Sequence, residues 1–172
     1  RAGNVIGGGD WAVDRIVPDC MNSWMNKKEI VLRNPFATRP WQHVLEPLSG
    51  YLLTASKLFN DDIVRGESFN FGPKADQDFS VEELVVELSK FWNDAKWKVE
   101  SAQDQPHEAG LLKLNCDKAL TLLNWLPTLN FRQTVEFTAT WYKQFEVKDN
   151  LFKYTLGQID NYVSLSEKVN DD

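Results

Sequence analysis

The chain has 172 residues, of which 42% are hydrophobic and 26% charged, and its formal net charge is −6 at pH 7. This is the composition of a globular chain with about one domain's worth of residues, and it excludes an intrinsically disordered polypeptide. The acidic balance, without a lysine or arginine cluster, argues against a nucleic-acid-binding protein, and no apolar run approaches the ~20 residues of a bilayer-spanning helix.

The sequence contains two cysteines, Cys20 and Cys116. Neither has a CxxC neighbour or a histidine at metal-ligand spacing, so we expect two ordinary thiols in a reducing compartment and no bound metal. The first residues lack the basic and apolar leader of a signal peptide and read like the end of a strand. A cytoplasmic protein is therefore expected.

The first part of the chain is predicted to be a strand, a turn and a helix. Residues 1–6 have the pattern of a strand end, and residues 7–10 form a glycine-rich turn. A helix follows and extends to about Asn26, with Asp14 as its N-cap and Pro18 in its first turn.

Two short extended segments and a second helix come next. Residues 30–33 and 41–45 are the extended segments, and Glu46-Pro47 is typical of the start of a helix. The periodicity places the apolar residues of this helix on one face: Leu48, Tyr51, Leu52, Ala55, Leu58 and Phe59.

The middle of the chain returns to strands around a third helix. Residues 67–71 alternate like a strand, and residues 97–99 and 111–114 have the same character. Between them, Ser80 and Glu83 form a capping box, which predicts that a helix begins there.

Three helices are expected in the last third. Asn115 can cap a short helix that extends to about Asn124, and residues 131–147 have an amphipathic helical pattern. From Asn150 onward the apolar spacing predicts a last helix. Since strands and helices alternate along the chain, the fold class is α/β or α+β, of which we expect α/β, but the strands are few and short for a complete doubly wound sheet.

The best-known cofactor motifs are absent from the sequence. Gly7-Gly8-Gly9-Asp10-Trp11 is neither a G-x-G-x-x-G fingerprint nor a phosphate-binding loop, so a tight turn after a strand is the better interpretation. A tyrosine followed four residues later by a lysine, which would lower the phenol pKa for proton transfer, does not occur either.

Polar side chains gather instead at the predicted ends of strands, where open α/β folds bind ligands. They are Asn4, Arg15, Arg33, Arg39, His43, Asn70, Gln105, His107 and Glu108. An arginine fork suits a pyrophosphate because it donates two parallel hydrogen bonds. The alternative is that each of these residues has only a structural role. The arginines would be solvated, Asn70 would bond to the backbone, His43 would be buried in a strand, and His107 and Glu108 would form a surface ion pair. Spacing alone leaves both interpretations open.

The sequence resembles the extended short-chain dehydrogenase/reductase family, and within it the CDP-glucose 4,6-dehydratases. The matching segments include the run R-P-W-Q-H-V-L-E-P-L and cover most of the chain: residues 1–11, 14–19, 33–35, 39–48, 69–73, 105–109, 112–114 and 123–125. The resemblance implies the C-terminal part of such an enzyme, with short strands and helices forming the substrate-binding region. The N-terminal Rossmann half, which carries the NAD fingerprint and the catalytic Tyr and Lys, is not matched by any segment.

The resemblance also implies roles for individual residues, none of them catalytic. Residues 1–148 would be the substrate-binding portion with the last core elements, and residues 149–172 a helical tail. Substrate-binding residues would be Asn4, Arg15, Ile16, Ile30, Leu32, Arg39, Asn70, Gln105 and His107. Among these, Arg15 and Ile16 would meet the nucleotide, Ile30 and Leu32 the base, and Arg39 the pyrophosphate. The backbone near Val5 would lie by the nicotinamide, and His43 would support Arg39.

The activity implied by the resemblance is NAD-dependent conversion of CDP-D-glucose to CDP-4-dehydro-6-deoxy-D-glucose for surface polysaccharide synthesis. NAD would be bound mainly by the N-terminal half, so we expect the isolated chain to be inactive. The implied partners are a nucleotide-sugar substrate, that half and further copies of the chain. Two alternatives stay open: a non-catalytic nucleotide-sugar-binding or interaction module, and part of another NDP-sugar dehydratase or epimerase.

Overall fold

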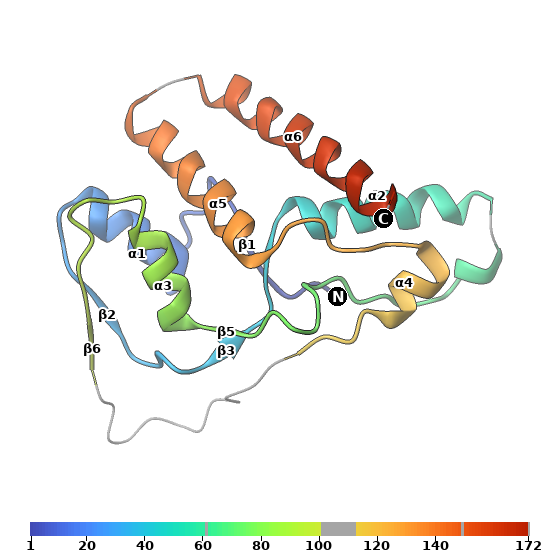
Figure 1. Cartoon of the computed structure of the whole chain (residues 1–172), viewed down its shortest axis with the longest axis horizontal. Helices are drawn as coiled ribbons and strands as arrows, with labels where there is room; N and C mark the ends of the chain where they lie inside the picture. Colours follow the sequence, from blue (N-terminus) through green and yellow to red (C-terminus); the bar gives the residue numbers. More distant parts are fainter. Residues whose placement is uncertain (61, 101–112, 149, 172) are drawn as a thin grey trace.

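The computed structural model describes residues 1–60, 62–100, 113–148 and 150–171. Its helices alternate with short strands, as the sequence predicts for an α/β fold (Figure 1). The strands are β1 (Asn4–Ile6), β2 (Ile30–Leu32), β3 (Thr38–Arg39), β4 (Trp41–His43), β5 (Phe79–Ser80) and β6 (Trp97–Val99). The helices are α1 (Ile16–Met25), α2 (Leu45–Leu58), the 3-10 turn η1 (Asp62–Val64), α3 (Val81–Ser89), α4 (Asp117–Leu123), α5 (Phe131–Glu146) and α6 (Leu151–Asp171).

The strands form three separate pairs in the described part of the chain. β1 pairs with β4 in parallel, with Asn4 opposite Trp41, and β2 pairs with β6 in parallel. β3 and β5 are antiparallel. Residues 67–71 were predicted as a strand, but they contribute only an isolated parallel bridge between Phe71 and Ala2. With two or three residues per strand, none of these pairs makes a continuous sheet, which agrees with the predicted incomplete sheet.

Two predicted helix starts are wrong in detail. Asp14 does not cap α1: its φ of 61° lies in the left-handed region, and Arg15 occupies the N-cap position without a side-chain cap. Cys116, not Asn115, is the N-cap residue of α4, although Asn115 Oδ1 accepts a hydrogen bond from the Asp117 backbone N–H at 2.9 Å. Residues 113 and 114 carry no strand, and the rest of the predicted strand 111–114 lies outside the described residues.

Capping boxes begin two of the helices. At α3 the Ser80 side chain accepts from the Glu83 N–H and the Glu83 carboxylate accepts from the Ser80 N–H, which confirms the prediction from the sequence. Asn130 and Gln133 make the same reciprocal pair at the start of α5. Each box satisfies N–H groups that a helix start leaves without intrahelical partners.

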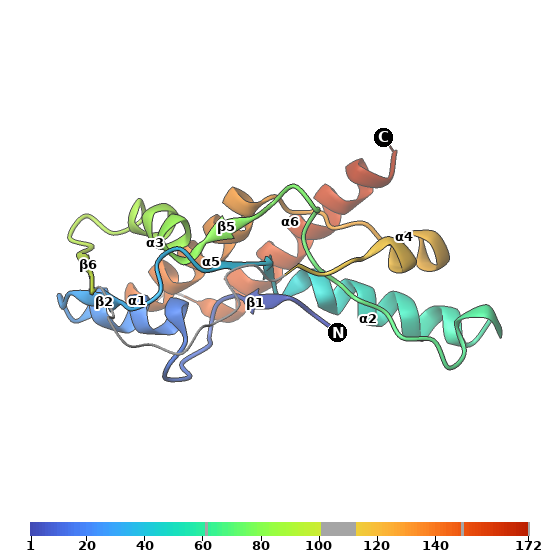
Figure 2. The ribbon, with the colours of Figure 1, turned by 90° about the horizontal axis from the view of Figure 1, so that it is seen from below.

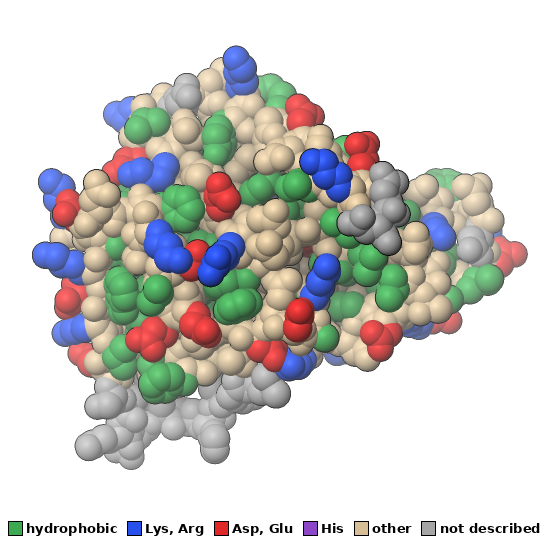
Figure 3. All heavy atoms as spheres, viewed as in Figure 1, with side chains coloured by type: hydrophobic (Ala, Val, Ile, Leu, Met, Phe, Trp, Pro, Cys, Tyr) green, Lys and Arg blue, Asp and Glu red, His purple; other side chains and the backbone are tan. Residues whose placement is uncertain are grey.

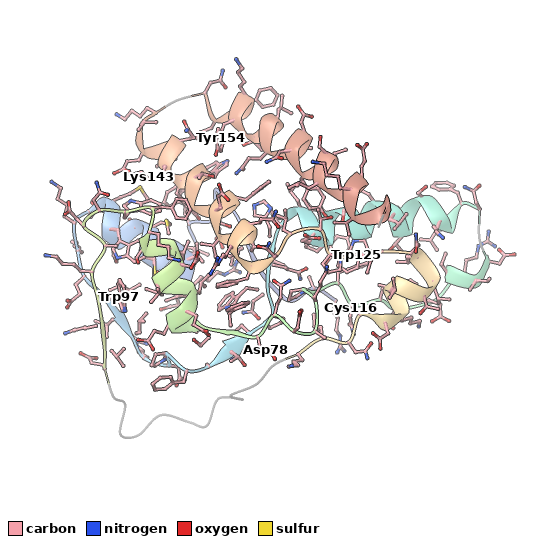
Figure 4. The ribbon with its side chains drawn as sticks, viewed as in Figure 1. Asp78, Trp97, Cys116, Trp125, Lys143 and Tyr154 are labelled. Atoms are coloured by element: carbon pink, nitrogen blue, oxygen red, sulfur yellow. The ribbon has the colours of Figure 1, made fainter. Side chains whose placement is uncertain are left out.

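The main core lies where α1, α3 and α5 pack around β2 and β4. Its buried residues include Met21, Leu32, Leu84, Val135 and Tyr142. A second cluster joins α4 to the chain around Phe69 and Phe71. Its buried residues are Val64, Phe69, Phe71, Ala119, Leu123 and Trp125. The indole N–H of Trp125 (Figure 4) donates to Ser49 Oγ at 3.0 Å. Both clusters are aromatic-rich, as expected from the composition.

Helix α2 has a buried side and an exposed apolar face. Its buried side includes Pro47 and Gly50, and a Cβ added at Gly50 would lie 2.4 Å from the Phe71 ring, so this glycine permits close packing. The apolar residues that the sequence places on one face are all exposed: Leu48, Tyr51, Leu52, Ala55, Leu58 and Phe59. Figure 2 shows α2 beneath α4 at one end of the molecule.

The surface carries both signs of charge. On the face shown in Figure 3, lysines and arginines are interspersed with aspartates and glutamates. No helix in the described part of the chain is both long and apolar enough to cross a membrane. The same residues include no group of three or more His, Cys, Asp or Glu side chains that could hold a metal ion.

Candidate functional site

A cavity of about 480 Å³ lies between β1, the turn that follows it and the start of α1. We call it the β1–α1 cavity. Its lining residues are Gly3, Asn4, Val5, Ile6, Gly7, Asp10, Asp14, Arg15, Ile16, Val17, Pro18 and Trp41. It is lined by all three residues of β1, by the turn that follows β1, and by Trp41 at the start of the parallel neighbour β4. A larger groove of about 710 Å³ runs between α5 and α6, away from any strand end.

The first turn of α1 forms one wall of the cavity. No side chain of the described residues caps the N-terminus of this helix, so the N–H groups of Ile16 and Val17 can meet an anion, and the helix dipole favours negative charge there. Pro18 has no N–H, and the Asp19 N–H donates to the Arg15 carbonyl at 2.9 Å. Ile16 and Pro18 add an apolar surface beside these donors. A site with apolar walls and a few convergent polar groups is the usual form of a small-molecule pocket.

Arg15 stands at the mouth of the cavity. Its Nη1 donates to Asp10 Oδ2 at 3.0 Å, and the guanidinium side chain is 64% exposed. An exposed ion pair of this kind is worth only ~0–1 kcal/mol, so a phosphate can take the place of the carboxylate at little cost. Burial first, and second the nearby Asp14 of the cavity lining, raise the pKa of Asp19 in the first turn of α1.

The glycine turn is held against α5 by close packing. A Cβ at Gly8 would lie 2.0 Å from Trp141 Cγ, and Gly9 has a φ of +82°. The Tyr142 hydroxyl donates to the Asp10 carbonyl at 2.6 Å, and burial raises the pKa of this phenol to about 12. These contacts support the predicted interpretation of the glycines as a tight turn and explain why three of them occur together.

His43 is buried behind the same turn. Its Nδ1 accepts a hydrogen bond from the Leu45 N–H at 3.4 Å, and its ring packs edge-on to Phe137. Nε2 has no hydrogen-bond partner among the described residues, and burial lowers the pKa of the imidazole to about 4. His43 is therefore neutral at pH 7, and it lies against α5 rather than in the cavity lining.

The structure brings four of the predicted ligand residues together. Asn4, Val5, Arg15 and Ile16 all line the β1–α1 cavity. The sequence analysis did not assign Asp10, Asp14 or Trp41 to a site, although the Gly-Gly-Gly-Asp turn directly after a predicted strand was a signal for Asp10.

Other predicted ligand residues lie elsewhere. Arg39 is in β3, and its Nη1 donates to the Thr38 carbonyl at 2.8 Å. Asn70 donates to the Asn115 carbonyl at 2.9 Å, which is the backbone contact of the structural alternative. Ile30 and Leu32 are buried in the main core and do not line the cavity. Gln105, His107 and Glu108 lie outside the described residues.

No family model matches the chain. The chain is 40% identical over 169 residues to CDP-glucose 4,6-dehydratase from Salmonella typhimurium, an alignment that covers 98% of this chain and 47% of that protein, in its C-terminal part. It is 23% identical over 151 residues to UDP-glucose 4-epimerase from Mycoplasma pneumoniae, covering 84% and 44%. The chain thus spans about half the length of the curated relatives that it matches.

Solved structures show the same fold. UDP-glucuronic acid 4-epimerase from Bacillus cereus, in complex with UDP-glucuronic acid and NAD, matches with a TM-score of 0.69 at 20% identity, over 84% of this chain and 44% of that one. dTDP-glucose 4,6-dehydratase from Bacillus anthracis, in complex with NAD, matches with a TM-score of 0.64 at 19% identity. This match covers 84% of this chain and 43% of that one. These matches confirm the predicted fold: that of the C-terminal part of the extended short-chain dehydrogenase/reductases.

Proposed function

We propose that this chain is the nucleotide-sugar-binding part of an NAD-dependent CDP-glucose 4,6-dehydratase, which makes CDP-4-dehydro-6-deoxy-D-glucose in the cytoplasm for polysaccharide synthesis. The observation that carries the proposal is the 40% identity to a CDP-glucose 4,6-dehydratase over nearly the whole chain. The β1–α1 cavity supports it, because the Arg15 guanidinium and the N–H groups at the start of α1 suit an anionic small molecule.

Asn4, Arg15, Ile16 and the start of α1 have different parts in binding the substrate. The N–H groups of the first turn of α1 and the Arg15 guanidinium meet the pyrophosphate, since both offer donors to anionic oxygens. Ile16 provides an apolar contact for the nucleotide. Asn4, whose side-chain amide can both donate and accept, bonds hydroxyl groups of the sugar.

The chain's contribution to NAD binding is small. The residues at the β1 end of the cavity fit the nicotinamide, because Val5 offers an apolar side chain beside polar backbone groups. NAD would supply acceptance and return of a hydride, which is the cofactor's own chemistry. Within the chain, Asn4 and Arg15 hold and orient the sugar nucleotide, and no described residue is assigned a proton-transfer step.

The proposed partner of this chain is an N-terminal Rossmann half, which would supply most of the NAD-binding site and the catalytic residues. The curated relatives are about twice as long as the segment they share with this chain. The exposed apolar face of α2 fits such a partner, because contiguous exposed apolar side chains mark surfaces that another body covers.

Another NDP-sugar enzyme is the second candidate. The matches to UDP-glucose and UDP-glucuronic acid 4-epimerases favour it, because those proteins share the same fold. The two candidates differ in the nucleotide base, so affinities for CDP-glucose and UDP-glucose separate them.

The Arg15→Ala variant tests the site. With Trp41 in the cavity wall, intrinsic fluorescence reports a titration with CDP-glucose. We expect Arg15→Ala to weaken binding about tenfold, because one charge-assisted contact to phosphate is lost. Arg39→Ala tests separately the pyrophosphate contact that the resemblance implies for Arg39, a residue that does not line the cavity.

Arg65→Ala is the matched control, because Arg65 also pairs with an aspartate at 2.8 Å and is similarly exposed at 63%, but does not line the cavity. Its affinity should equal that of the unchanged chain. The site assignment is contradicted if Arg15→Ala binds CDP-glucose as tightly as Arg65→Ala does.

A further inference from the structure

Helix α6 presents an apolar stripe to solvent. Phe152 is 75% exposed, and Leu156, Ile159 and Val163 are 38–47% exposed. Their spacing of four, three and four residues is that of the seam between two paired helices. We call these four residues the α6 stripe.

The contacts of α6 with the rest of the protein come from another side of the helix. Trp141 Nε1 donates to Thr155 Oγ1 at 3.0 Å, Gln158 donates to the Phe137 carbonyl at 2.7 Å, and Tyr162 is buried. Figure 1 shows α6 packed along α5 on one side, at the periphery of the molecule. Nothing in the described part of the chain therefore covers the α6 stripe.

Two opposite charges flank the stripe on the side of the groove between α5 and α6, which Lys153 also lines. Lys153 follows Phe152 in the sequence and Asp160 follows Ile159, so both lie on the same flank of the helix, and both side chains are exposed. On the other flank, Thr155 and Tyr162 face the body of the protein. The stripe thus has one charged flank, with a cation toward one end and an anion toward the other.

We propose that the α6 stripe is a self-association surface, on which α6 of a second copy packs antiparallel. In this register Phe152 meets Val163 of the second copy, and Leu156 meets its Ile159. The two-fold symmetry of such a pair then places Lys153 of each copy beside Asp160 of the other, which makes two identical ion pairs. In a parallel pair the charged flanks of the two copies would lie on opposite sides of the seam, so neither ion pair would form. Charge complementarity therefore selects a second copy in antiparallel orientation.

The proposal does not depend on the proposed function, because α6 contributes no residue to the β1–α1 cavity. It gives the expected homo-oligomer a specific surface. It also differs from the role proposed for α2, since that face is assigned to a different body.

Charge reversal in the 172-residue chain, measured by sedimentation velocity over a range of concentrations, tests the proposal. Lys153→Glu and Asp160→Lys should each raise the dimer dissociation constant about tenfold, because each turns two attractive pairs into two repulsive ones. The double variant Lys153→Glu/Asp160→Lys should restore the dimer, since both pairs reform with the signs exchanged.

Lys168→Glu is the matched control, because it makes the same charge change at an exposed position of the same helix, away from the stripe. It should leave the dissociation constant unchanged. All three substituted positions are on the surface, so circular dichroism should show that the four variants are equally folded. A chain that stays monomeric, or a dimer that neither single reversal weakens, would overturn the proposal.

Discussion

His43 shows how burial of one side chain sets a pH dependence. The imidazole is neutral in the fold because burial lowers its pKa to about 4, whereas in the unfolded chain its pKa is near 6.5. As the pH falls from about 6.5 to about 4, the His43 imidazole becomes protonated in the unfolded chain but stays neutral in the folded chain. The contribution of neutral His43 to the free energy of unfolding is therefore fully present above pH 6.5 and is lost as the pH falls from about 6.5 to about 4.

We predict that the free energy of unfolding contains a His43 contribution that falls by about 2 kcal/mol between pH 7 and pH 5. Urea unfolding of the unchanged chain and of His43→Gln at both pH values measures it. The other histidine, His107, is present in both proteins, so its effect cancels in the difference. Equal pH slopes in the two proteins would mean that His43 is not buried as a neutral group.

Gly8 is a position where any side chain must displace Trp141. We predict that Gly8→Ala lowers the free energy of unfolding by about 1–3 kcal/mol or more, because a Cβ there overlaps the indole ring. The matched control is Gly157→Ala in α6, where a Cβ meets nothing within 4 Å. That substitution should stabilise the helix by roughly 0.5–1 kcal/mol. Thermal unfolding of both variants decides whether the turn is packed as described.

The type of a residue was a poorer guide to its role than its position in the sequence. Asn4 and Arg15 were identified by their place after predicted strands and turns, and both line the cavity. Asn70 shares that kind of position, yet its amide is bonded to the Asn115 backbone, a partner 45 residues away that no local pattern reveals. Asp14 has the residue type of an N-cap, but its left-handed backbone prevents that role.

At the scale of elements, Glu46 ties three parts of the chain together. This buried carboxylate at the start of α2 accepts hydrogen bonds from the Leu129 N–H at 2.6 Å, the Thr128 N–H at 3.0 Å and the Tyr162 hydroxyl at 3.0 Å. Burial raises the pKa of Glu46, and these bonds counteract part of that effect. The loop before α5 and the middle of α6 are thereby fixed to α2.

We predict that Glu46→Gln lowers the free energy of unfolding by about 1–3 kcal/mol, because an amide cannot accept with both of its terminal atoms and buried donors lose partners. Tyr162→Phe should cost about 1 kcal/mol. Since both changes affect the same network, the double variant should cost clearly less than the sum. Chemical unfolding of the two single variants and the double variant gives this comparison, and strict additivity would show that the two groups do not interact.

The helices could be predicted better than the strands. Ser80–Glu83 fixes the start of α3 by local hydrogen bonds, and this is why the sequence reveals it. The strand predicted at residues 67–71 needs a neighbour to pair with, and here only Phe71 finds one. The periodicity of α2 correctly grouped its apolar residues on one face, but whether that face is covered depends on what lies beside it.

At the scale of the whole molecule, the account makes this chain a binding part that needs another part for chemistry. We predict no NAD-dependent turnover of CDP-glucose by the 172-residue chain alone, because none of its four tyrosines is followed by a lysine at the spacing that proton transfer requires. The full-length relative from Salmonella typhimurium, assayed in parallel, is the positive control. Turnover by the isolated chain would show that its catalytic groups have been missed.

Binding of CDP-glucose to the chain tests the central claim most directly. Two-dimensional NMR spectra of the 172-residue chain, recorded during a titration with CDP-glucose, locate the binding site residue by residue. The account predicts saturable shifts of the amide signals of Asn4, Val5, Arg15 and Ile16, around the β1–α1 cavity. Spectra that do not change, or shifts confined to the larger groove between α5 and α6, would contradict it.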